Sequence, residues 1–219
     1  YYITESKEEG GDTMKKRLLT LAAVAVIALS FTACGGGNAP DNKDSSGSTS
    51  ASSGGEQSAG AQEYDVGDFT VMVPEKWFIA PQRDLFGDED EDGNKPVLAD
   101  YIGLIKDGTS EYDAWNKPTV YIKYYNDSNA EYQAELVKMA YDETEQIECV
   151  LDDGTECIAY EALYKPVTDA GTESTYYFIY IPTGDESCLQ VNFPKDMDGV
   201  GLDIKDADVQ TILNGITLG

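Results

Sequence analysis

From Tyr64 onward, apolar and polar residues alternate in short runs, a pattern that predicts β-strands. In "DFTVMVP", Phe69, Val71 and Val73 fall on one face of a strand, which Pro74 ends. Further strands are predicted to begin in "KWFIA" (76–80), to cover 119–125, 174–182 and 187–194, and to flank the turn Asp152-Asp153-Gly154 within 146–164. Glycine supplies the positive φ of such a turn, so this last segment predicts a hairpin.

Two segments have the pattern of helices. In "SNAEYQAELVKMAYDE" (128–143), Ser128 and Glu131 have the spacing of a capping box. The apolar residues that follow at helical spacing are Tyr132, Leu136, Met139 and Ala140. The second segment, "KDADVQTILNGITL" (205–218), predicts a helix that begins at Asp206 or Asp208 and ends at a C′ glycine, Gly215.

Hairpin strands with one helix between them and one at the end favour an α+β sandwich with a mainly antiparallel sheet. The opening "FTVMVPEKW", the hairpins and the closing "DVQTILNGITL" resemble the PsbP-like α/β/α domains of small bacterial lipoproteins, over roughly residues 66–219. The resemblance implies a single globular domain over 64–219. It also implies a partner-binding role, and it supplies no shared catalytic residues.

The N-terminal part has the order of a secretory signal. A basic stretch at 14–17 precedes an apolar segment, 18–31, that is too short to span a bilayer, and "TAC" (32–34) follows it. Residues 14–37 resemble the signal peptide and lipobox of bacterial lipoproteins, with Phe31 where that family prefers leucine. The resemblance implies cleavage before Cys34, a diacylglycerol on its thiol and often a further acyl chain, such as palmitate, on its amine. An ordinary signal peptide and an uncleaved membrane anchor are the alternatives.

The residues before and after this segment also fit the signal peptide of a lipoprotein. Residues 1–13 would be unusual ahead of a signal peptide, and "KEEGG" is what a purine-rich ribosome-binding sequence would encode, so we expect Met14 to be the true start. Residues 34–63 comprise Cys34 and a segment rich in Gly, Ser, Asn, Asp and Gln, and this composition predicts a disordered tether. The expected location is therefore the outer face of a bacterial cell membrane, where the protein is held by its lipid.

The charge and the residue composition of the chain exclude some classes of function. The chain has 15 Lys and Arg against 41 Asp and Glu, a net charge of −26, and no histidine. Such an acidic chain is not expected to bind nucleic acid, whose phosphates require clustered basic residues. The absence of histidine excludes triads and metal sites that depend on it.

One acidic stretch, "DEDEDGN" (88–94), matches the first half of a calcium loop. Asp88, Asp90 and Asp92 alternate, and Gly93 stands where that loop turns sharply. The twelfth position, where a bidentate glutamate belongs, is Ala99. The alternatives are a calcium site, which would be the only cofactor of the chain, and an ordinary solvated turn.

Besides Cys34, the chain contains Cys149, Cys157 and Cys188, an odd number that leaves at least one thiol without a disulfide partner. A three-residue loop at Asp152–Gly154 would place Cys149 directly opposite Cys157, whereas a two-residue loop would not. The alternatives are a cross-strand disulfide and three small buried side chains, of which the second is favoured.

Tyrosines give the best indication of a binding surface. If Val120 and Ile122 face the core, Tyr121 and Tyr125 face outward. "TYYFIY" likewise places Tyr176, Phe178 and Tyr180 on one face. Neighbouring aromatic rows of this kind suit a platform for sugar rings or peptide. The alternative is that a helix covers this face.

The sequence therefore predicts a non-catalytic binding or assembly module, anchored by lipid at the cell envelope, whose partner is an envelope protein, peptide or glycan. The rival is a small envelope hydrolase that uses two carboxyl groups, one of them with a raised pKa.

Overall fold

The computed structural model describes residues 60–166 and 171–219, so the predicted signal peptide, Cys34 and the tether up to residue 59 lie outside the described residues. The strands are β1 (Gln62–Asp65), β2 (Phe69–Val73), β3 (Trp77–Arg83), β4 (Val97–Lys106), β5 (Thr119–Tyr125), β6 (Glu143–Ile147), β7 (Ile158–Tyr164), β8 (Ser174–Gly184), β9 (Ser187–Met197) and β10 (Thr217–Leu218). The helices are α2 (Ala130–Ala140), α3 (Ala207–Asn214) and a short 3-10 helix, η1 (Glu111–Trp115). Within the described ranges, no helix has the length and apolar character needed to cross a membrane.

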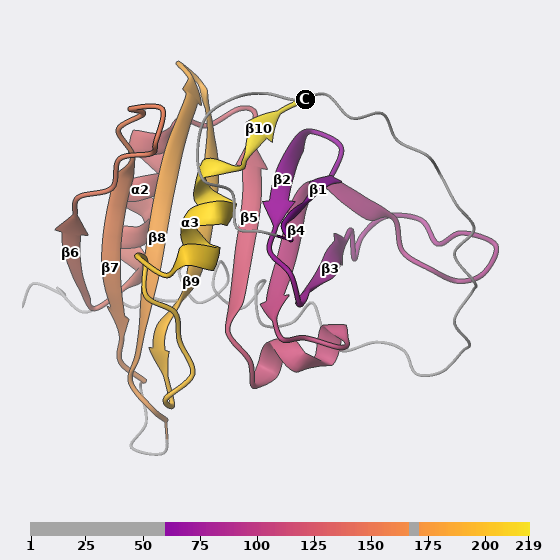
Figure 1. Cartoon of the computed structure of the whole chain (residues 1–219), viewed down its shortest axis with the longest axis horizontal. Coiled ribbons are helices and arrows are strands. Elements are labelled where there is room, and N and C mark those ends of the chain that lie inside the picture. The colour runs from indigo at the N-terminus through magenta and orange to yellow at the C-terminus, as the bar shows by residue number, and fades with distance from the viewer. Residues whose placement is uncertain (1–59, 167–170) are drawn as a thin grey trace, which may run out of the picture.

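The strands form two antiparallel sheets (Figure 1). One has the order β1-β2-β10, and the other has the order β3-β4-β5-β9-β8-β7-β6. The α+β class and the mainly antiparallel sheet are confirmed. The long strand β4 was not predicted, and Gln62 and Glu63, predicted to end the tether, lie in β1.

The first face of the seven-stranded sheet carries the main core. Figure 1 shows α3 and the small sheet lying across this face. Phe69, Val71 and Val73 of β2 are buried against it, as their alternation predicts. Ile122 of β5 and Val209 of α3 are buried in the same cluster, so the helix and both sheets share one core.

The second face is covered by α2, which packs mainly on β6 to β9. The buried residues of α2 are Ala130, Ala134 and Val137, whereas Tyr132 is 60% and Met139 is 68% exposed. Tyr132 and Met139 thus lie on the outer side of the helix, and Leu136 is partly exposed. The reason lies in the sheet beneath, where aromatic side chains such as Phe178 fill the space and leave room only for small helix residues.

The ends of the helices differ in detail from the prediction. Asn129, not Ser128, caps α2, since its side chain accepts a hydrogen bond of 2.9 Å from the N–H of Tyr132. Asp206 caps α3, and Gly215 follows that helix. The φ of Gly215 is −102°, so glycine is not needed there for a left-handed turn. A Cβ at this position would lie 2.4 Å from Cβ of Met72, so glycine is needed because β2 approaches closely.

Candidate functional site

The two halves of the second face differ in how far a helix covers them. Helix α2 packs mainly on the half formed by β6 to β9. In the described part of the chain, no helix packs to a similar extent over the middle of β4 and β5; η1 contacts β3 and β4. The side chains of β4 and β5 on this face are therefore the candidates for contact with a partner.

Four side chains form what we call the Tyr–Lys surface: Tyr101, Tyr121, Lys123 and Tyr125. The antiparallel register pairs Tyr101 with Lys123, and the alternation along β5 places Tyr121 and Tyr125 on the same face. The rings of Tyr101 and Tyr121 lie with centroids 6.1 Å apart at 48°. Nζ of Lys123 lies 5.7 Å from the ring centroid of Tyr101 and 4.9 Å from that of Tyr125. One cation is thus held between two rings, a favourable cation–π arrangement.

Gly103 makes room for this arrangement. It pairs with Tyr121 across β4 and β5, and a Cβ there would lie 3.2 Å from the Tyr121 ring and 3.3 Å from the amide nitrogen of Gln82. The Tyr121 ring therefore lies over the backbone of β4. Tyr101, Tyr121 and Tyr125 are all only partly exposed.

The tyrosine hydroxyls of this surface stay protonated at neutral pH. Desolvation raises the pKa of Tyr121 and of Tyr125 to about 12, and it raises the pKa of Tyr101 as well. The hydroxyl of Tyr125 donates a hydrogen bond of 3.0 Å to the side-chain oxygen of Gln190 on β9. The surface therefore offers aromatic rings, neutral hydroxyls and one positive charge.

The second predicted aromatic row has a different environment. Phe178 and Tyr180 are only 3% and 1% exposed, because they lie beneath α2. Tyr176 is half-buried and packs with Tyr141 and Phe178, with ring centroids 6.2 and 6.5 Å away. The prediction that Phe178 and Tyr180 are available to a ligand is therefore wrong. Tyr101, which was missed, lies in the unpredicted β4; the run "YIGLI" before Asp107-Gly108 was the available signal for that strand.

The acidic loop between β3 and β4 is organised by its own hydrogen bonds. Oδ1 of Asp90 accepts from the N–H groups of Asp92 and Asn94, at 3.0 and 2.7 Å, and the bond from Asn94 helps to lower the pKa of Asp90. Among the described residues, no group of three or more acidic or cysteine side chains is arranged to hold a metal ion. Asp88, Asp90 and Asp92 thus do not converge on one point, and the loop is a self-bonded turn.

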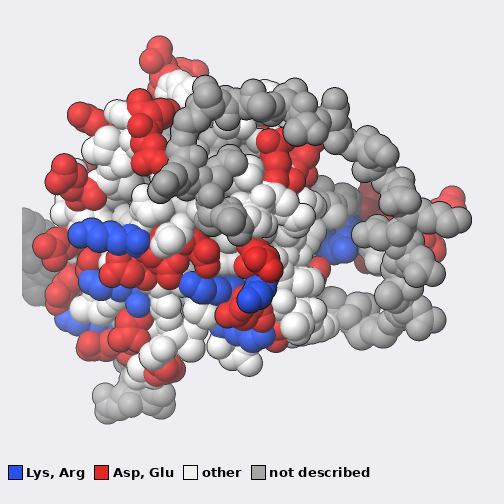
Figure 2. All heavy atoms as spheres, in the orientation of Figure 1, with Lys and Arg blue, Asp and Glu red and all other residues white. Residues whose placement is uncertain are grey.

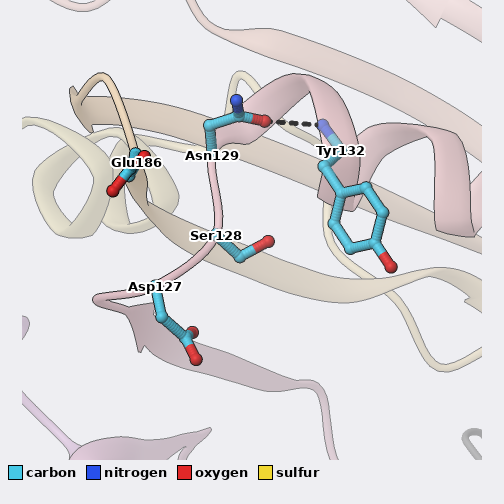
Figure 3. A pocket seen from close by; sticks show the side chains of 5 residues that line it. All are labelled: Asp127, Ser128, Asn129, Tyr132 and Glu186. Carbon is cyan, nitrogen blue, oxygen red and sulfur yellow. Dashed lines mark hydrogen bonds between the residues drawn. The ribbon is translucent and has the colours of Figure 1, made fainter.

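A shallow hollow of about 450 Å³ lies at the start of α2. Its lining residues are Asp127, Ser128, Asn129, Tyr132 and Glu186 (Figure 3). Asn129 uses its side-chain oxygen to cap the helix, as the dashed line in Figure 3 shows. Both carboxylates are exposed, so the hollow lacks the desolvated acid that general acid catalysis requires.

Carboxyl groups elsewhere give no better support for a hydrolase. Among the described residues, Asp90, Asp113, Asp153 and Asp206 have shifted pKa values, and all four shifts are downward. The pKa of Asp113 falls to about 2 because the backbone N–H of Thr109 and the Lys117 ammonium hydrogen-bond to its carboxylate. A general acid needs the opposite shift.

Positive side chains on the α3 face are interspersed with acidic ones (Figure 2). Lys195 pairs with Glu161 at 2.5 Å, Lys165 pairs with Glu143, and Lys106 lies 3.0 Å from Asp206. In contrast, no described carboxylate forms an ion pair with Lys123 of the Tyr–Lys surface. Lys123 is thus a cation that a partner can still neutralise.

No family model matches the sequence, and no curated protein does either. Three solved structures with a similar course of the chain are 11–12% identical to it in sequence. A protein from Bacteroides thetaiotaomicron matches over 73% of this chain with a TM-score of 0.42, and this chain spans about half (48%) of that one. The Ran-binding protein Mog1p of Saccharomyces cerevisiae matches over 74% of this chain and 96% of its own, with a TM-score of 0.43. Cyanobacterial PsbP from Synechocystis matches over 77% and 98%, with a TM-score of 0.39.

Proposed function

We propose that this protein is a non-catalytic binding module, anchored by lipid at the outer face of a bacterial cell membrane, and that the Tyr–Lys surface holds its partner. The observation that carries the binding part is the arrangement of Tyr101, Tyr121, Lys123 and Tyr125 on the half of the sheet that α2 leaves open.

The chemistry of this surface indicates the partner. Rigid, partly exposed tyrosines bind flat apolar surfaces at a small entropic cost and also donate hydrogen bonds. Lys123 lies between two rings without a described carboxylate partner, so it favours a ligand that carries an anionic group. A peptide or glycan of the cell envelope that bears carboxylates meets both requirements.

The anchoring part is supported by the sequence from Met14 to Cys34. A diacylglycerol on Cys34 would supply two acyl chains, which is what stable membrane association requires. The test is mass spectrometry of the protein isolated from its native membrane. A lipid-modified N-terminal Cys34 is expected, and an unmodified thiol would refute this part.

The binding part is tested by isothermal titration with two probes, a wall-derived glycan fragment that carries carboxylates and an acidic peptide. We expect one of them to bind, and Tyr121→Ala and Lys123→Met each to weaken that binding at least tenfold, about 1.4 kcal/mol. The matched controls are Phe86→Ala, an exposed aromatic residue in the β3–β4 loop, and Lys205→Met, an exposed lysine before α3. Equal losses in the controls, or no binding of either probe, would contradict the proposal.

A further inference from the structure

The β6–β7 hairpin extends beyond the ends of its two strands in a single register. Ile147 pairs with Ala159, and Val150 pairs with Glu156 in an isolated bridge. The N–H of Leu151 donates to the carbonyl of Thr155 at 3.0 Å, which closes a three-residue loop in which Gly154 has a φ of +88°. The three-residue alternative is therefore confirmed.

This register places Cys149 directly opposite Cys157. The N–H of Cys157 donates to the carbonyl oxygen of Cys149 at 2.9 Å, so the two residues form a hydrogen-bonded antiparallel pair. Such pairs have Cα atoms about 5.5 Å apart, which lies within the range that a disulfide spans. The Cβ atoms of such pairs lie farther apart than a disulfide allows, so bond formation would require the two arms of the hairpin to approach each other at this pair.

The two thiols already interact. Both side chains are half-buried and pack against the edge of the main core, and a hydrogen bond from Cys157 lowers the pKa of Cys149. The same contact raises the pKa of Cys157. The two thiols are therefore coupled, so that one of them loses its proton more readily and the other less readily.

The third cysteine has a different environment. Cys188 is fully buried on the opposite face of the sheet, in the cluster beneath α2. Burial raises its pKa to about 11, which keeps it protonated. The three cysteines of the domain thus comprise one opposed pair and one enclosed thiol.

We propose that Cys149 and Cys157 form a redox-active dithiol that is oxidised to a cross-strand disulfide by thiol–disulfide exchange with a small-molecule or protein disulfide. The thiolate of one of the two cysteines attacks one sulfur of the oxidant and displaces the other as a thiolate, which leaves a mixed disulfide. The second cysteine then loses its proton and attacks the sulfur of the first, which displaces the second thiolate. Two electrons and two protons pass to the oxidant, which leaves as two thiols.

The disulfide would join the two arms of a hairpin whose tip contacts the last helix, since the N–H of Asp152 donates to the side-chain oxygen of Asn214 at 2.8 Å. Oxidation should therefore slow hydrogen exchange at the hairpin tip. This inference does not depend on lipid anchoring or on the Tyr–Lys surface.

The first test uses the full chain with Cys34→Ala, equilibrated with glutathione at graded ratios of disulfide to thiol. After an acid quench, the protein is alkylated and sites are assigned by mass spectrometry. We expect Cys149 and Cys157 to lose alkylation together, with the loss of two hydrogen atoms from the protein, while Cys188 stays a thiol. Independent alkylation of all three cysteines at every ratio, or a disulfide that includes Cys188, would overturn the proposal.

A second test traps the mixed disulfide. In Cys157→Ser and in Cys149→Ser, the remaining thiol of the pair should accumulate a glutathione adduct, which the wild type resolves into the internal disulfide. An adduct that is equally persistent in the wild type would refute exchange within the pair. Circular dichroism spectra check that both variants fold, and the redox titration above needs neither variant.

Discussion

The two faces of the seven-stranded sheet are covered to very different extents. The first face is closed by α3 and the three-stranded sheet, and its residues form the larger core cluster. The second face is covered by α2 over one half only, and the other half carries the Tyr–Lys surface. The contrast indicates that the first face stabilises the fold, whereas the open half of the second is where we propose that a partner binds.

The largest effect is expected at the centre of the closed face. Phe193 is fully buried there, with its ring centroid 5.2 Å from that of Tyr177. Phe193→Ala should lower the free energy of unfolding by about 3–5 kcal/mol, because it leaves a cavity in a packed core. Urea unfolding monitored by tryptophan fluorescence measures this loss.

The matched control is Phe86→Ala. Phe86 is 96% exposed, so its removal should change the unfolding free energy by less than about 0.5 kcal/mol. Similar losses for the two variants would contradict the assignment of the closed face as the principal core.

An intermediate effect is expected where α2 meets the sheet. Ala134 is 2% exposed against the aromatic side chains of the second face. Ala134→Leu should destabilise the protein by about 1–3 kcal/mol, because the added atoms have no space. Glu135→Leu, which adds a similar side chain one residue later on the exposed side, is the control. If Glu135→Leu proved the more harmful, the buried side of α2 would be assigned incorrectly.

The same helix shows what local sequence pattern leaves undetermined. Periodicity correctly indicates a helix here, but the largest apolar residues, Tyr132 and Met139, lie outside and the alanines inside. Which side is buried depends on the size of the residues on β7 and β8 that the helix meets, and these are distant in sequence. Strand alternation is more informative: Phe69, Val71 and Val73 are all buried as predicted, since period-two patterns report the face directly.

The candidate site was predicted in part for a related reason. Alternation correctly places Tyr121 and Tyr125 on the face opposite Ile122. It places Phe178 and Tyr180 on that same face, but only the strand order β5-β9-β8 shows that these two lie beneath α2. That order is set by pairing between strands far apart in the sequence, so it cannot be predicted from a local pattern.

A smaller effect is expected from the ion pairs on the closed face. Nζ of Lys106 lies 3.0 Å from Asp206 and 3.4 Å from Asp208, which joins β4 to the start of α3. Lys106→Met should lower the unfolding free energy by up to about 1 kcal/mol at neutral pH. The loss is small because all three side chains are partly exposed to water.

The pH dependence of this loss has a defined sign. Burial alone would raise the pKa of Asp206, but hydrogen bonds from Lys106 and the α3 backbone lower it overall, below the usual 3.8. The pKa of Lys106 is raised above 10.5 by the two carboxylates, against the effect of burial. The difference between the wild type and Lys106→Met should therefore be constant near neutrality, shrink as the pH falls below about 3.8, and shrink again above about 10.5. Thermal unfolding across this pH range measures it, and a difference that grew in acid would contradict the assignment.

The smallest effect on stability is expected from the same substitution on the open half. Lys123 has no ion-pair partner among the described carboxylates, and methionine retains an unbranched side chain of similar length over the Tyr101 and Tyr125 rings. Lys123→Met should therefore lower the unfolding free energy by about 0.5 kcal/mol, because it removes the cation–π contacts but keeps the packing on both rings. Because Lys106→Met and Lys123→Met remove the same charge, their difference in unfolding free energy isolates what the closed face contributes through its carboxylates. If Lys123→Met were the more destabilising of the two, Lys123 would mainly stabilise the sheet. That result would contradict the proposal that the open half of the second face binds a partner.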